Sequence, residues 1–199
     1  MDLVHRMLRR LYDFTMSLAA RPHAKTFLGG IAFVESSVFP IPPDVLLIPM
    51  VLANRAHAWR IALICSIFSV LGGMFGYLIG AVFFEWIGQP IIDFYGYADK
   101  FGRFTEAYNE WGGWIVAFFG LTPFPYKVIT IASGVTHLNL AVFIIASVLS
   151  RSLRFFLVAG LLWKFGDPIR EFIEKYLGLL TIIFFVLLIG SFLALKYML

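Results

Sequence analysis

Apolar residues fill five long stretches of this 199-residue chain, and three of the stretches are continuous enough to cross a lipid bilayer. Residues 61–83 carry no charge, residues 138–163 are equally extended, and residues 176–195 run uninterrupted between two lysines. A transmembrane helix needs about 20 mostly apolar residues to span a hydrocarbon core of roughly 30 Å. The pattern therefore predicts three transmembrane helices.

The other two stretches, roughly residues 26–53 and 112–135, are interrupted by proline pairs: Pro40 and Pro42 in the first, Pro123 and Pro125 in the second. Proline lacks a backbone donor and clashes with the preceding turn, so neither stretch can form one continuous helix. Non-helical backbone at membrane depth is tolerated only inside protein or beside a water-filled cavity. We expect two re-entrant helical hairpins with prolines at their tips. A kinked helix that spans the membrane is the simpler alternative.

The two interrupted stretches also repeat each other. Gly29 and Gly30 precede the first proline pair at the same spacing as Gly112 and Gly113 precede the second, with an offset of 83 residues throughout. A predicted transmembrane helix follows each copy, so each copy crosses the membrane once and the two copies must be inverted. Inverted repeats are typical of secondary transporters, whose sites lie where interrupted helices meet near the midplane.

The first 25 residues show the periodicity of a basic amphipathic helix, with an apolar side formed by Val4, Met7, Leu8, Leu11, Phe14 and Leu18. Such a helix lies in the plane of the membrane interface; a contact within a homo-oligomer is the alternative. The chain is therefore expected to be a single all-α membrane domain. Its parts are an interfacial helix (1–25), a first repeat (26–83), an amphipathic surface linker (84–111), a second repeat (112–163), and a surface segment with the C-terminal transmembrane helix (164–199).

Composition agrees with a membrane protein, because 60% of the residues are hydrophobic and only 14% are charged. Soluble domains carry about 25% charged residues. The net charge of +4 is scattered, so no nucleic-acid partner is expected. Cys65 is the single cysteine, and no histidine pair has the spacing of a metal site or a catalytic dyad. We therefore expect no metal, no cofactor, no catalytic residue and no enzyme activity.

Loop charges orient the chain in the membrane. The first 25 residues carry five Lys/Arg, and the 54–60 loop adds Arg55 and Arg60, whereas residues 84–111 contain only Lys100 and Arg103. Because cytoplasmic loops carry an excess of Lys and Arg, the N-terminus is predicted to be cytoplasmic.

Five ionisable residues fall at membrane depth: Glu35, Asp44, Lys127, Arg151 and Arg154. Each costs about 2.5–3.5 kcal/mol at a helix centre, so each is a functional candidate. The two acids flank the first proline tip and are the candidates for proton coupling. The three bases are the candidates for binding a lipid phosphate, because guanidinium groups match phosphate oxygens bidentately.

Structural explanations exist for the same five residues. Glu35 can pair with Arg151, Asp44 can pair with Lys127, and Arg154 can extend its head toward the cytoplasm. The glycines of the first long helix have the small-xxx-small spacing of close helix packing: Gly72, Gly73, Gly76 and Gly80.

The segment of Glu35, Pro40, Pro42 and Asp44 resembles the E-x4-P-x-P-x-[DE] segment of the DedA family, also described as SNARE-associated or VTT-domain membrane proteins. The glycine series with Tyr77 is similar too. The resemblance covers roughly residues 28–165. The second hairpin departs from the family pattern, because it lacks the expected arginine and retains only Lys127. The chain therefore looks like a divergent branch of the family.

The resemblance implies a protein of the bacterial inner membrane that moves lipids across the bilayer. Bacterial members are associated with returning undecaprenyl phosphate to the cytoplasmic face and with proton homeostasis, and eukaryotic relatives with phospholipid scrambling. The expected function is a proton-coupled flippase for a phosphate-headed lipid. A membrane scaffold or assembly factor is the alternative, followed by a membrane-embedded lipid-phosphate enzyme.

Overall fold

The computed structural model of the chain describes residues 23–39, 42–122, 125–166 and 168. Within these ranges the chain is almost entirely helical and contains no strand, which confirms the predicted all-α class. The predicted interfacial helix lies almost wholly outside the described residues, and the predicted C-terminal helix at 176–195 lies wholly outside them.

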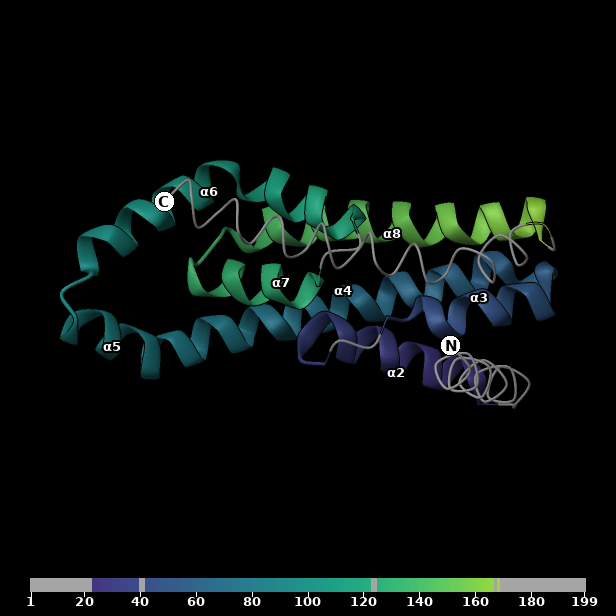
Figure 1. Ribbon diagram of the computed structural model, residues 1–199, viewed down its shortest axis with the longest axis horizontal. Coiled ribbons are helices and arrows are strands. Elements are labelled where there is room, and N and C mark those ends of the chain that lie inside the picture. The colour runs from purple at the N-terminus through teal and green to yellow at the C-terminus, as the bar shows by residue number, and fades with distance from the viewer. Residues whose placement is uncertain (1–22, 40–41, 123–124, 167, 169–199) are drawn as a thin grey trace, which may run out of the picture.

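Two long helices, α4 (Ala58–Phe83) and α8 (Leu140–Phe165), pack side by side and run in opposite directions (Figure 1). Both are long and apolar enough to cross a membrane, α4 as part of a helical stretch from Arg55 to Phe94. The side chain of Asn139 caps α8 by accepting the backbone N–H groups of its first turn. These helices correspond to two of the three predicted transmembrane segments.

Both proline-containing stretches are broken, as predicted. The first consists of α2 (Ala24–Ser37) and α3 (Asp44–Ala53), and the second of α6 (Ala98–Leu121) and α7 (Tyr126–Val135). Pro43 and Pro125 directly precede α3 and α7, where a missing backbone N–H is not needed for a helical hydrogen bond. The prolines therefore separate each stretch into two helices.

The boundaries of the helices follow the repeat found in the sequence. Adding the offset of 83 to the bounds of α3, 44 and 53, gives 127 and 136, and α7 runs from 126 to 135. The same addition to the bounds of α4, 58 and 83, gives 141 and 166, and α8 runs from 140 to 165. The two halves of the chain therefore share one pattern of secondary structure.

The packing exchanges helices between the two halves. Helix α2 packs along α4 and α6 along α8, whereas α3 packs against α8 and α7 against α4. The pair α2 and α3 occupies the half of the bundle where α4 begins, and the pair α6 and α7 occupies the opposite half (Figure 1). The two breaks consequently lie next to each other, near the middle of the bundle.

Residues 84–111, predicted as an amphipathic surface linker, are helical. Helix α4 continues through a π-helical turn (Phe84–Gly88) into α5 (Gln89–Phe94), and Gly96, with φ of +67°, helps to reverse the chain before α6. Helix α6 starts at Ala98, before the expected start of the second hairpin, because no proline interrupts the helical pattern between Ala98 and Leu121. Its location at a membrane surface stays a prediction.

The glycines of α4 allow direct contact between helix backbones. A Cβ at Gly72 would collide with the carbonyl oxygen of Phe33 in α2, and one at Gly80 with the carbonyl oxygen of Ile131 in α7. Gly134 of α7 similarly faces the carbonyl oxygen of Tyr77. Close packing through small residues is therefore confirmed, and it brings α2 and α7 to one side of α4.

Candidate functional site

The two helix breaks are tied together by polar contacts. Thr130 Oγ1 of α7 donates to the carbonyl oxygen of Ser36 at 3.0 Å, and Lys127 Nζ donates to that of Val38, also at 3.0 Å. Backbone carbonyls near the end of α2 have no helical partner, so side chains of the other half satisfy them. The breaks thus form one junction in which both halves of the chain take part.

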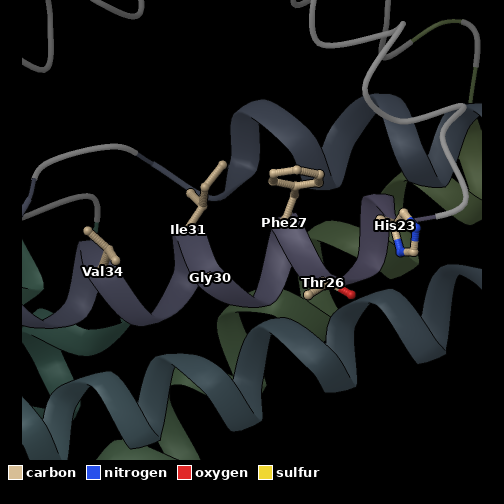
Figure 2. A pocket seen from close by; sticks show the side chains of 6 residues that line it. All are labelled: His23, Thr26, Phe27, Gly30, Ile31 and Val34. Carbon is tan, nitrogen blue, oxygen red and sulfur yellow. The ribbon is translucent and has the colours of Figure 1, made fainter.

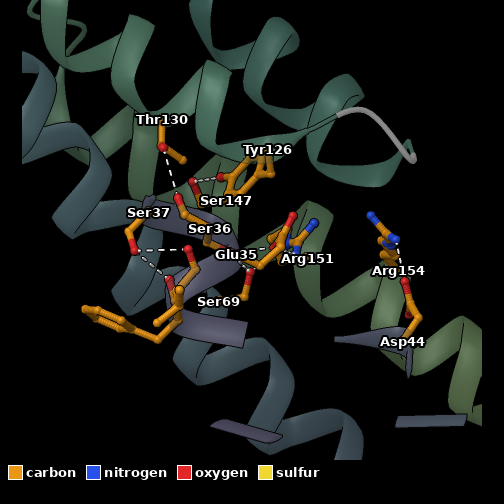
Figure 3. Close-up of polar contacts among 12 residues, drawn as sticks. Glu35, Ser36, Ser37, Asp44, Ser69, Tyr126, Thr130, Ser147, Arg151 and Arg154 are labelled. Atoms are coloured by element: carbon orange, nitrogen blue, oxygen red, sulfur yellow. Dashed lines mark hydrogen bonds and ion pairs between the residues drawn. The ribbon is translucent and has the colours of Figure 1, made fainter. Parts of the chain in front are cut away.

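An ion pair between Glu35 and Arg151 lies at the centre of this junction (Figure 3). Arg151 Nη2 is 2.8 Å from Glu35 Oε2, and the arginine is 0% exposed. Helix α2 carries the acid in its last turn, and α8 carries the arginine near its middle. We refer to Glu35 and Arg151 as the inner pair.

Polar and aromatic groups surround the guanidinium of Arg151. Its Nε donates to Ser69 Oγ at 2.6 Å, and Ser69 shares a second hydrogen bond with Ser36. The Tyr126 and Phe155 rings each lie 4.8 Å from Arg151 Cζ. A planar guanidinium stacks on ring faces while its edge donates hydrogen bonds, an arrangement that lysine cannot reproduce.

A second ion pair, the outer pair, joins Asp44 to Arg154 one helical turn further along α8. Arg154 Nη2 is 2.7 Å from Asp44 Oδ2, and the two side chains are 16% and 22% exposed for Arg154 and Asp44. Arg154 Nη1 also donates to the carbonyl oxygen of Thr122 at 3.1 Å. Arg154 therefore contacts both helix breaks at once, at a partly exposed position.

Two buried polar atoms of these pairs have no hydrogen-bond partner among the described residues: Arg151 Nη1 and Asp44 Oδ1. An unpaired buried donor or acceptor costs about 1–3 kcal/mol, more when it is charged. The site therefore offers one charged donor and one charged acceptor for a ligand or ordered water.

The structure brings all five predicted residues to the junction. The alternative pairing of Glu35 with Arg151 is confirmed, whereas pairing of Asp44 with Lys127 is wrong, because Asp44 pairs with Arg154. The roles in proton coupling and phosphate binding stay predictions. Of the predicted tip residues, Pro42 and Pro125 flank the two breaks, whereas Pro40 and Pro123 lie outside the described residues.

Sequence reasoning did not identify the residues that position Arg151. Ser69 lies in a long apolar helix and Ser36 follows Glu35, so isolated hydroxyls beside glycines in an apolar stretch were the available signal. Tyr126 gave no such signal, since an aromatic residue is common in a membrane helix. Its hydroxyl donates to Ser147, which fixes the ring against Arg151.

The long apolar helices and the charged junction between interrupted helices define an all-helical membrane protein. The model of the VTT domain matches residues 41–164, and the chain belongs to this family, the DedA or SNARE-associated family. The matched region contains four of the five charged residues, and Glu35 precedes it.

Two bacterial proteins are similar to the chain over most of its length. An uncharacterized protein of Haemophilus influenzae is 38% identical over 168 residues, which cover 82% of this chain and 87% of that protein. An uncharacterized protein of Histophilus somni is 36% identical over the same shares of both chains. No solved structure matches the chain.

Proposed function

We propose that this protein moves a phosphate-headed lipid, a polyprenyl phosphate or a phospholipid, across the bacterial inner membrane in a proton-coupled cycle. The observation that carries the proposal is the junction itself, where two arginines meet two carboxylates between interrupted helices. Ionisable groups at membrane depth are costly and mark substrate or proton pathways.

The arrangement of the helices supports alternating access. In this proposal α2 with α3 and α6 with α7 are re-entrant hairpins that enter from opposite membrane faces, and the two halves are inverted repeats. The shared offset of the helix boundaries and the exchanged packing favour this topology. Transporters of this type bind substrate where broken helices meet. The loop charges favour a cytoplasmic N-terminus.

The proposed chemistry is an exchange of anions on an arginine. A lipid phosphate replaces Asp44 at Arg154, and the released carboxylate takes up a proton, so the buried charge stays balanced. Arg154 is the first contact because it is partly exposed, and Lys127 at the same junction adds positive charge. Glu35 and Arg151 repeat the exchange deeper in the bundle, where Arg151 Nη1 is a donor without a partner.

Transport by purified protein in liposomes tests the proposal. A fluorescent lipid with a phosphate head is followed between leaflets by quenching from outside, with and without an imposed pH gradient. We expect transport that responds to the gradient, and a clear loss in Arg154→Lys, which keeps the charge but not the fork that contacts Asp44 and Thr122. Equal rates in protein-free liposomes would contradict the proposal.

The complete burial of Arg151 and its pairing with Glu35 favour a second candidate, a scaffold or assembly factor in which the charges only fix the packing. The double variant Arg151→Gln with Glu35→Gln separates the two functions. A scaffold regains its folding and its cellular role when both charges are removed. A transporter regains folding but not lipid movement.

A further inference from the structure

The outward face of α2 bears an apolar groove that the charged junction does not use. It has a volume of about 560 Å³ and is lined by six residues of one helical stripe: His23, Thr26, Phe27, Gly30, Ile31 and Val34 (Figure 2). At 1.5 Å per residue, the stripe from His23 to Val34 is about 16 Å long. The groove therefore has an elongated shape.

Gly30 keeps the middle of the groove open. A Cβ built at this glycine has no atom within 4 Å, whereas its neighbour Gly29 faces the Phe68 ring of α4. The helix thus packs closely on one side and leaves a hollow on the other. Because the groove walls are carbon-rich and lie on a helix of a membrane protein, an apolar chain fits there and water does not.

The groove leads to a cation. The exposed apolar stripe continues from Val34 to Val38, about 6 Å further along α2, and the carbonyl oxygen of Val38 accepts a hydrogen bond from Lys127 Nζ. Lys127 is only partly buried, so its remaining donors can bind an anionic oxygen. An apolar groove that ends at an ammonium group complements a lipid with one tail in the groove and its phosphate at Lys127.

We infer that this groove holds one acyl chain of a glycerophospholipid whose phosphate is bound by Lys127. The inference rests on the proposed transport function and narrows its substrate to phospholipids. We choose an acyl chain because the bilayer surrounding α2 supplies it at high concentration. The opposite face of α2 carries Glu35, so the bound lipid lies one helix away from the inner pair.

Photocrosslinking of the full chain in phosphatidylcholine liposomes tests the inference. The probes are phosphatidic acid with a diazirine in one acyl chain, diacylglycerol with the same chain, and a polyprenyl phosphate with a diazirine in its tail. Crosslinked residues are mapped by mass spectrometry. Phosphatidic acid should label residues 27–34 above the other exposed apolar surfaces, and should exceed diacylglycerol by about fivefold, the effect expected of one lysine near the membrane surface.

Two variants give the inference a matched control. Gly30→Leu should fill the groove and reduce labelling of residues 27–34 several-fold. Gly102→Leu, at a helical glycine of α6 that is exposed and also has no atom near its Cβ position, should leave labelling unchanged. Lys127→Gln should remove the preference for phosphatidic acid and leave diacylglycerol labelling unaffected.

Three results would overturn the inference: labelling spread evenly over all lipid-facing helices, labelling unchanged by Gly30→Leu, or a stronger signal from the polyprenyl probe. A disulfide that forms readily between Gly30→Cys and Leu11→Cys would instead assign the groove to the chain's own N-terminal segment. The transport assay is independent of these results. Labelling of the groove without transport would leave the lipid site intact and refute the function, and transport without labelling would do the reverse.

Discussion

The inner and outer ion pairs use the same two residue types one helical turn apart on α8, yet their surroundings differ. The inner arginine is fully buried, stacked between two rings and hydrogen-bonded to Ser69, whereas the outer pair is partly exposed and touches a backbone carbonyl. Buried pairs are costly to break because a single charge remains without solvent, and exposed pairs contribute little. The difference teaches that position in the junction, and not residue type, separates a fixed charge pair from an exchangeable one.

The largest expected effect comes from removing the inner acid. Glu35→Gln leaves Arg151 charged, buried and without its carboxylate, because an arginine cannot lose its proton, so unfolding free energy should fall by about 3–5 kcal/mol. Asp44→Asn should cost no more than about 1 kcal/mol, since Arg154 is partly exposed and keeps Thr122 as a partner. Unfolding of the purified chain in micelles measures both. Equal losses in the two variants would remove the distinction between the pairs.

A smaller effect is expected from the hydroxyl that supports the inner arginine. Ser69→Ala leaves Arg151 Nε without an acceptor and should cost about 1–3 kcal/mol. Ser66→Ala is a matched control, because Ser66 is also buried in α4 but donates only to the carbonyl oxygen of Ala62 in its own helix. If the control loses as much stability as Ser69→Ala, the serine does not act through the arginine.

The smallest effect on stability accompanies a test of access. In a Cys65→Ala background, Asp44→Cys should react with a water-soluble thiol reagent, whereas Glu35→Cys should react far more slowly, because its position is buried within α2. Mass spectrometry of the intact chain follows both reactions. A lipid phosphate that occupies Arg154 should slow the reaction at residue 44, and similar rates at residues 35 and 44 would show that both pairs are accessible.

The sequence predicted the helix breaks and the charged residues of the junction, because proline chemistry and the cost of buried charge act locally. It did not predict which acid meets which base. Glu35 and Arg151 are 116 residues apart, and their contact depends on the rotation of α8, which an almost uniformly apolar helix does not reveal in its sequence. The same uncertainty explains why Asp44 was considered a partner for Lys127 and not for Arg154.

The helical character of residues 84–111 shows another limit. Amphipathic periodicity indicated a surface segment, but the continuation of α4 through Phe84–Gly88 produces no break signal in the sequence. The glycines of α4 were informative, since their spacing implied close packing. Only the structure identifies their partners as the Phe33 and Ile131 carbonyls.

Those glycine contacts divide the described helices into two rigid blocks. Direct backbone contact holds α2 and α7 to α4, while α6 packs on α8 through Gly120 and Ser150, and α3 joins the same helix. Hydrogen bonds near the breaks, such as those from Lys127 and Arg154, stay within a block. The outer pair also lies within one block, whereas the inner pair joins the two. Any shear of one block past the other must therefore separate Glu35 from Arg151 while Asp44 and Arg154 travel together, which makes the inner pair the latch of the bundle.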